Sequence, residues 1–161
     1  MEELTLSEAF RNGGYRTGSI GKWHLGSEPF SLPEHHRFDF NTGGNAHDAP
    51  ENDFDPWHGY WAIAGTGQQV RWNVPPDGQQ GDDLTNRLTD EAMKFIKQCG
   101  DQLFFQSWSN CGVHTPLQAP ETMIRNYRQI PAQKRRGDTV YAAKVESIDD
   151  SVGRVMETLQ Q

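Results

Sequence analysis

The chain has few cysteines, little basic charge and no long apolar run, and each shortage excludes a class of protein. Its 161 residues include only two cysteines, Cys99 and Cys111, which lack the C-x-x-C spacing of a redox or zinc site. The net charge is −7, and the longest basic run is Lys134-Arg135-Arg136. No apolar segment approaches the roughly 20 residues that span a bilayer. The sequence therefore predicts no disulfide framework, no nucleic-acid partner and no membrane span.

The N-terminus also lacks the pattern of an export signal. It reads Met1-Glu2-Glu3-Leu4, which is acidic where a secretory signal would be basic. On this reading, the chain as given would stay in the cytoplasm.

The order of predicted elements favours an α/β fold. Capping signals, helical spacing of apolar residues and short apolar runs are the evidence for the individual helices and strands. The predicted order is a helix over 5–13, a strand over 15–20, a strand or hairpin arm over 68–74, a helix over 82–100, a strand over 103–108, a helix over 121–127 and a final helix over 141–159. Strands that alternate with helices are typical of α/β domains.

Two of these helices carry apolar stripes that predict core faces. The first stripe consists of Leu84, Leu88, Ala92, Phe95 and Ile96, and the second of Tyr141, Val145, Ile148, Val152, Val155 and Leu159. The pair Asp149-Asp150 lies on the last helix, where a solvated face explains it.

Residues 27–81 form a long segment without a sustained period of 2 or 3.6. More than about 50 irregular residues inside a domain usually indicate a binding surface or disorder, so we expect an insertion or a substrate-facing loop. Its histidines (His35, His36, His47 and His58) and its aspartates, Asp53 among them, lack metal-ligand spacing. Its aromatic residues (Trp57, Tyr60, Trp61 and Trp72) could stack on sugars, but packing of the segment against the core is favoured.

One candidate site follows the first predicted strand, in the run GSIGKWHLG over 18–26. In extended geometry, Lys22 and His24 project to the same face. A lysine beside a histidine at a strand end suits an oxyanion such as sulfate or phosphate. The phosphate-binding pattern G-x-x-x-x-G-K-[ST] does not fit, because Trp23 follows the lysine. The alternative is a surface lysine beside a packed histidine.

A second candidate site follows the strand over 103–108, in the run SNCGVHTPL over 109–117. His114 would donate a hydrogen bond to an anionic substrate or act as a general acid, and the alternative is a structural histidine that caps the turn. Nothing nearby marks Cys111 as an activated thiol. Ligands of open α/β sheets bind beyond the carboxyl ends of strands, which is where both runs lie.

Four segments together resemble the sulfatase family. The first, GYRTGSIGKWHLG over 14–26, matches the second sulfatase signature at almost every position. The others are LTDEA over 88–92, VHTPLQAP over 113–120 and YAAKVESIDDSVG over 141–153. Their spacing is similar to that of family members that act on carbohydrate sulfates. The resemblance covers most of the chain and is weakest over 46–80.

This resemblance implies a fold, a reaction and roles for three residues. The fold would be a partial alkaline-phosphatase-like α/β sandwich over 1–161, with an incomplete, mostly parallel sheet. The reaction of the complete enzyme would be hydrolysis of a sulfate ester of a saccharide. Lys22 would bind the sulfate and the formylglycine nucleophile. His24 would hydrogen-bond the formylglycine hydroxyl and assist sulfate release, and His114 would bind sulfate near the leaving-group oxygen.

The chain departs from the family pattern at the nucleophile and the metal. Neither Cys99 nor Cys111 begins a C-x-P-x-R motif, so no formylglycine precursor is present. The aspartate pairs that bind Ca²⁺ in the family are also missing from the sequence. We therefore expect the chain to begin inside the family domain, to stop before its end and to be inactive alone.

Three other readings stay open on the sequence. One is a phosphatase or phosphodiesterase of the same superfamily, against which the GKWHLG run speaks. Another is a non-catalytic protein that binds sulfated glycans or other anions, and the last is a gene fragment without a function of its own. The incomplete sheet further predicts marginal stability or self-association through unpaired edges.

Overall fold

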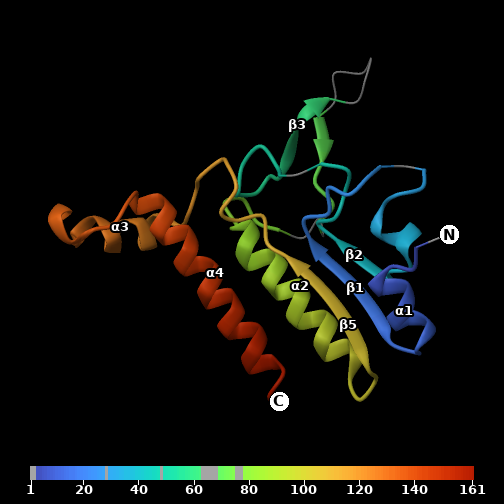
Figure 1. The fold of residues 1–161 in the computed structure, drawn as a ribbon. Helices are drawn as coiled ribbons and strands as arrows, with labels where there is room; N and C mark the ends of the chain where they lie inside the picture. Colours follow the sequence, from blue (N-terminus) through green and yellow to red (C-terminus); the bar gives the residue numbers. More distant parts are fainter. Residues whose placement is uncertain (1–2, 28, 48, 63–68, 75–77) are drawn as a thin grey trace.

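A computed structural model of the chain describes residues 3–27, 29–47, 49–62, 69–74 and 78–161. Its main sheet contains three parallel strands in the order β2-β1-β5 (Figure 1). These strands are β1 (Arg16–Gly21), β2 (Phe40–Thr42) and β5 (Phe104–Ser109). The predicted α/β class and parallel sheet are confirmed, and each outer strand has one edge without a partner strand among the described residues.

The helix α1 (Leu6–Asn12) covers one face of this sheet. Thr5 caps it, since its side chain accepts a hydrogen bond from the Glu8 backbone while the Glu8 carboxylate accepts one from the Thr5 backbone. Phe10 then stacks on Phe105 of β5, with ring centroids 4.5 Å apart. The short helix predicted over 5–13 is thus present, and a capping box begins it.

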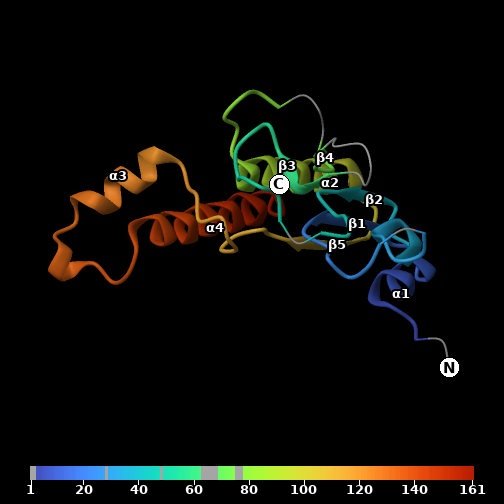
Figure 2. The same ribbon diagram turned by 90° about the horizontal axis from the view of Figure 1, so that it is seen from above.

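The helix α2 (Leu84–Cys99) lies on the opposite face from α1 (Figure 2). Asp83 caps it by accepting a hydrogen bond from the Asn86 backbone. Four of the five residues predicted for its apolar stripe are buried: Leu84, Leu88, Ala92 and Phe95. The Phe95 ring packs directly on Gly18 of β1, where a Cβ would lie 2.8 Å from the ring. The glycine thus lets α2 approach the sheet closely.

The helix α4 (Thr139–Thr158) packs beside α2, and α3 (Glu121–Gln129) packs on α4 (Figure 1). A short 3₁₀ turn, Ala132–Lys134, lies between α3 and α4. No helix of the described residues is long and apolar enough to cross a membrane.

The predicted core face of α4 is wrong in this structure. Tyr141, Val145, Val152 and Leu159 are each between 45% and 50% exposed, and only Ile148 and Val155 of the stripe are half-buried. The helix instead buries Ala143, Lys144, Ser147, Ser151 and Thr158. The predicted solvated face at Asp149 and Asp150 is correct, since both are exposed.

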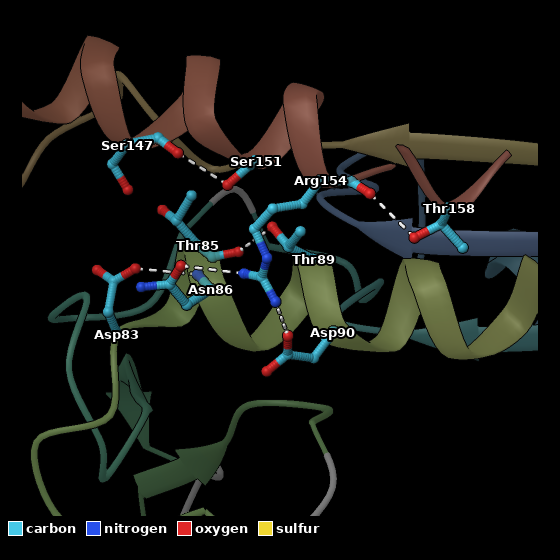
Figure 3. A network of polar contacts seen from close by, with 9 residues as sticks. All are labelled: Asp83, Thr85, Asn86, Thr89, Asp90, Ser147, Ser151, Arg154 and Thr158. Carbon is cyan, nitrogen blue, oxygen red and sulfur yellow. Dashed lines mark hydrogen bonds and ion pairs between the residues drawn. The ribbon is translucent and has the colours of Figure 1, made fainter. Parts of the chain in front are cut away.

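Small polar side chains make this buried face possible (Figure 3). The Ser151 hydroxyl donates to the Ser147 carbonyl and the Thr158 hydroxyl to the Arg154 carbonyl, so each hydroxyl is satisfied within its own helix. Arg154 reaches across to α2, where its guanidinium bonds Asn86 and forms an ion pair with Asp90. Close packing of these small residues, the Arg154 contacts and Val155, which packs against the core cluster that includes Leu88, therefore join α4 to α2.

The segment 27–81 holds more regular structure than its sequence indicates. It contributes β2, a 3₁₀ turn (Pro33–His36) and a two-stranded antiparallel sheet of β3 (His58–Ala62) and β4 (Gln69–Arg71). β4 lies within the predicted arm over 68–74, of which residue 68 is outside the described residues. β2 is the missed element that matters, because it pairs with β1 in the main sheet.

Candidate functional site

The loop after β1 begins where the backbones of β1 and β5 lie close together. Gly21 pairs with Ser109 in the parallel register, and a Cβ on Gly21 would lie 1.9 Å from the Ser109 carbonyl oxygen. The Lys22 backbone then donates to this same carbonyl oxygen at 2.8 Å. The loop is thereby held against the end of β5, and Lys22 leaves the sheet half-buried.

The same loop is bound on its other side by the chain after β2. The His24 backbone donates to the Asn45 carbonyl at 3.2 Å, and His24 itself has a left-handed φ of 54°. Gly43 lies against Gly21, since a Cβ there would be 3.0 Å from the Gly21 Cα. Gly43 and Asn45 were not among the predicted site residues, although a Gly43-Gly44 pair is a signal for close backbone approach.

The loop after β5 carries His114. Its backbone donates to the Cys111 carbonyl at 3.1 Å, which closes a turn. The ring Nδ1 lies 2.7 Å from the Thr115 carbonyl oxygen. Because a carbonyl only accepts, Nδ1 must carry a proton, and this bond fixes the orientation of the ring. The histidine therefore stabilises the turn, as the structural alternative requires, and can also present Nε2 to a ligand.

The three predicted site residues thus lie on loops near the carboxyl ends of the strands, at the upper end of the sheet in Figure 1. Lys22 and His114 follow adjacent parallel strands, and His24 is tied to the chain after the third. His24 and His114 are exposed to solvent.

Two amide side chains at this end of the sheet each have one polar atom without a hydrogen bond among the described residues. The Asn45 Nδ2 and the Asn110 Oδ1 are buried, and neither has a hydrogen-bond partner within the described part of the chain. They follow β2 and β5, respectively. Buried polar atoms usually have partners, so these two atoms suggest a place for ordered water or a polar ligand.

The described carboxylates do not fit a calcium site. Ca²⁺ requires six to eight oxygen ligands, but no group of three or more histidine, cysteine, aspartate or glutamate residues is arranged to hold a metal within the described ranges. Asp39 pairs with Arg11, Asp53 with Lys144 and Asp90 with Arg154. Two histidines for which no metal was predicted can be compared with the structure. The His36 ring lies beside the Trp23 ring, with ring centroids 5.5 Å apart, and the His58 side chain lies outside the described residues.

The remaining candidates for chemistry have structural roles. Cys99 and Cys111 are buried and do not form a disulfide, as expected, and burial raises the pKa of Cys99 above its ordinary value, which disfavours a thiolate. Trp57 and Trp72 are buried in the core around Phe95, so the favoured packing role is confirmed for them. The side chains of Tyr60 and Trp61 lie outside the described residues.

One pair of charged residues near the site was missed. Lys144 of α4 donates to the Asp53 carboxylate at 2.7 Å, and both side chains are buried. Burial raises the pKa of Asp53, while the Lys144 charge and its hydrogen bond act in the opposite direction and the nearby His114 adds a smaller effect of the same sign. The two residues are 91 positions apart, and no local pattern in the sequence links them.

Comparison with known proteins gives a consistent match. A family model described as Sulfatase matches residues 2–161. The human N-acetylgalactosamine-6-sulfatase is 31% identical over 165 residues, which cover 98% of this chain and 29% of that protein. An arylsulfatase of Klebsiella aerogenes is 27% identical over 208 residues, which cover 98% of this chain and 43% of that protein. The chain thus spans less than half the length of these relatives.

The fold comparison agrees. The crystal structure of Ps i-CgsB superposes with a TM-score of 0.68 at 25% identity and covers 96% of this chain and 36% of that one. The same protein in complex with k-i-k-neocarrahexaose gives a TM-score of 0.67 at 23% identity, over the same shares of the two chains.

Proposed function

Because the chain belongs to the sulfatase family, we propose that Lys22, His24 and His114 form the sulfate-binding part of the active site of a sulfuric ester hydrolase. One observation carries the proposal: the loops that hold Lys22 and His114 follow adjacent parallel strands, and the Lys22 backbone is bonded to the last residue of the other strand. α/β proteins bind ligands at this end of a parallel sheet, beyond the carboxyl ends of its strands.

Each residue has a role that its chemistry supports. The Lys22 ammonium neutralises sulfate oxygens and donates charge-assisted hydrogen bonds to them. His24 hydrogen-bonds the nucleophile and assists sulfate release, as in the family. His114 donates a proton from Nε2 toward the leaving-group oxygen, with its ring fixed by the bond from Nδ1 to the Thr115 carbonyl.

The proposed substrate is a sulfate ester of a saccharide. A relative at 31% identity is named as an N-acetylgalactosamine-6-sulfatase, and Ps i-CgsB was solved with k-i-k-neocarrahexaose. These names belong to those proteins. They support a sulfated saccharide, rather than a phosphate ester, as the first substrate class to test here.

The chain alone should have no measurable sulfatase turnover. Its sequence has no C-x-P-x-R motif for the nucleophile, and the described carboxylates do not fit the Ca²⁺ that the family uses. Loss of a nucleophile alone can cost about 10⁶ in rate. The check is hydrolysis of an aryl sulfate by the pure chain with added calcium, and calcium-dependent product formation would contradict this expectation.

Binding can be tested without turnover. We expect the pure chain to bind sodium sulfate and N-acetylgalactosamine 6-sulfate saturably in titration calorimetry. Loss of a hydrogen bond to a charged group costs about 1.5–3 kcal/mol, so Lys22→Ala and His114→Ala should each weaken binding roughly 10- to 150-fold. Lys97→Ala, which removes an exposed lysine of α2, is the control and should bind like wild type.

The outcomes separate the alternatives. Saturable binding that is lost in both site variants supports the proposal and a folded anion site. Tighter binding of a phosphate monoester than of the sulfate ester would favour the phosphatase reading. Equal binding by wild type and both variants, or no binding by a folded wild-type chain, would refute the proposed site.

A further inference from the structure

The Lys144–Asp53 ion pair lies against the loop that carries His114. Lys144 is 1% exposed, although lysine is almost never fully buried unless it is paired. Its Nζ donates to the Asp53 Oδ2 at 2.7 Å, and Asp53 is itself only 4% exposed. This contact joins α4 to the segment before β3.

Lys144 also contacts the start of the His114 loop. A Cβ on Gly112 would lie 2.8 Å from the Lys144 Cε and 2.9 Å from the Ile148 Cδ1. The aliphatic part of the lysine therefore packs against the backbone two residues before His114. A side chain at position 112 would displace the ends of the Lys144 and Ile148 side chains from this contact.

Asp53 holds the far end of the same loop. Its backbone donates to the Gln118 Oε1 at 2.8 Å, four residues after His114. Its own carbonyl accepts from the Leu84 backbone at 2.8 Å, which anchors it to the start of α2. The loop is thus contacted on both sides of the histidine, by the Lys144 side chain at Gly112 and by the Asp53 backbone at Gln118.

Stability alone does not account for an ion pair at this place. Removing two charges from water is costly, and apolar residues of similar volume often replace a buried pair without loss of stability. A charged pair with one fixed hydrogen-bond geometry does, however, restrict the position of the backbone segments attached to it.

We propose that Lys144 and Asp53 are positioning residues for His114: their buried ion pair fixes the loop over 110–118, and with it the imidazole that contacts the sulfate ester. This inference rests on the proposed function for its effect on sulfate binding. Its effect on the loop itself does not depend on that function.

The test compares three variants of the pure chain. Lys144→Met removes the charge and keeps much of the packing. Asp53→Asn/Lys144→Met leaves no buried charge and serves if the single variant fails to fold. Arg154→Met is the matched control, because it removes another ion pair of α4, the exposed one with Asp90 (Figure 3). Arg154 lies ten residues, or about 15 Å, along α4 from Lys144.

Two readouts are needed. The first is NMR of the backbone amides over 110–118 and of the His114 ring, assigned by loss of its signal in His114→Gln. The second is the dissociation constant for sodium sulfate. We expect both Lys144 variants to shift the loop and ring signals and to weaken sulfate binding about tenfold or more, while signals of α1 stay in place. Arg154→Met should change neither readout.

The two proposals can fail separately. If the wild-type chain binds no sulfate, the proposed function fails, and the NMR signals still decide the positioning role. If a folded Lys144 variant keeps the wild-type loop and ring signals and the wild-type dissociation constant, the positioning role is refuted. An equal shift of the loop signals in Arg154→Met would also refute it, since any loosening of α4 would then have the same effect.

Discussion

The close approach of Gly21 to Ser109 allows a direct test of how the carboxyl ends of β1 and β5 are held together. Gly21 is the last residue of β1 and has a φ of +93°. A Cβ there would lie 1.9 Å from the Ser109 carbonyl oxygen and 2.8 Å from its carbonyl carbon. Both are backbone atoms of the neighbouring strand, so no side-chain rotation can relieve the overlap. We therefore expect Gly21→Ala to separate the ends of β1 and β5.

The size of the effect follows from two costs. A side chain at this φ strains the backbone by about 1–3 kcal/mol. Overpacking against atoms that cannot move typically costs a further 1–3 kcal/mol or so. Gly21→Ala should therefore lower the free energy of unfolding by about 2–6 kcal/mol.

Gly81→Ala is the matched control. Gly81 has nearly the same φ, +91°, but a Cβ there would meet no atom within 4 Å. Gly81→Ala should lose only the free energy of the backbone strain. The difference in free energy of unfolding between the two variants therefore isolates the clash between β1 and β5. With a urea slope of about 2 kcal/mol per molar, a clash of 2 kcal/mol separates their unfolding midpoints by about 1 M.

The assay is urea unfolding followed by circular dichroism. Trimethylamine oxide can be added to all samples to keep the weaker variant folded at the start, since it strengthens effective burial. Equal midpoints for Gly21→Ala and Gly81→Ala would refute the argument, because they would mean that β1 and β5 do not approach as closely as described.

Three further predictions concern charges and exposed surfaces. Lys144→Met should cost about 3–5 kcal/mol at pH 7 by leaving Asp53 unpaired. Burial already raises the pKa of Asp53, so this carboxyl in the folded variant keeps a proton that the unfolded chain loses above about pH 4. The free energy of unfolding of Lys144→Met should therefore recover on acidification. Urea midpoints that do not change with pH would contradict this. Arg154→Ala should cost less than about 1 kcal/mol by the same assay, because its ion pair is exposed, and a larger loss would mean that this pair has a structural role beyond a surface contact. The free sheet edges and the exposed stripe of α4 should cause self-association in sedimentation velocity that Val145→Glu/Val152→Glu weakens, whereas a monomer at every concentration tested would contradict it.

Local sequence determined the elements whose signals lie within a few residues. The capping box at Thr5, the cap at Asp83 and the buried stripe of α2 were all predictable, because each depends on contacts inside one helix or on one apolar face. The loops that hold Lys22 and His114 were likewise predictable from glycine, proline and the strands before them. The motif segments over 14–26 and 113–120 also sufficed to indicate the family.

Tertiary structure decided what depends on distant partners. The strand β2 has only three residues, too few for a period to appear, and it exists because it pairs with β1. The apolar stripe of α4 was visible in the sequence, but periodicity does not state which face meets a neighbour. The face that packs on α2 is the one with the small residues Ser147 and Ser151, and the Ser151 hydroxyl is satisfied there by the Ser147 carbonyl of the same helix. The ion pair that supports His114 joins Lys144 to Asp53 across 91 residues, and only the packing of α4 against that loop brings the two together.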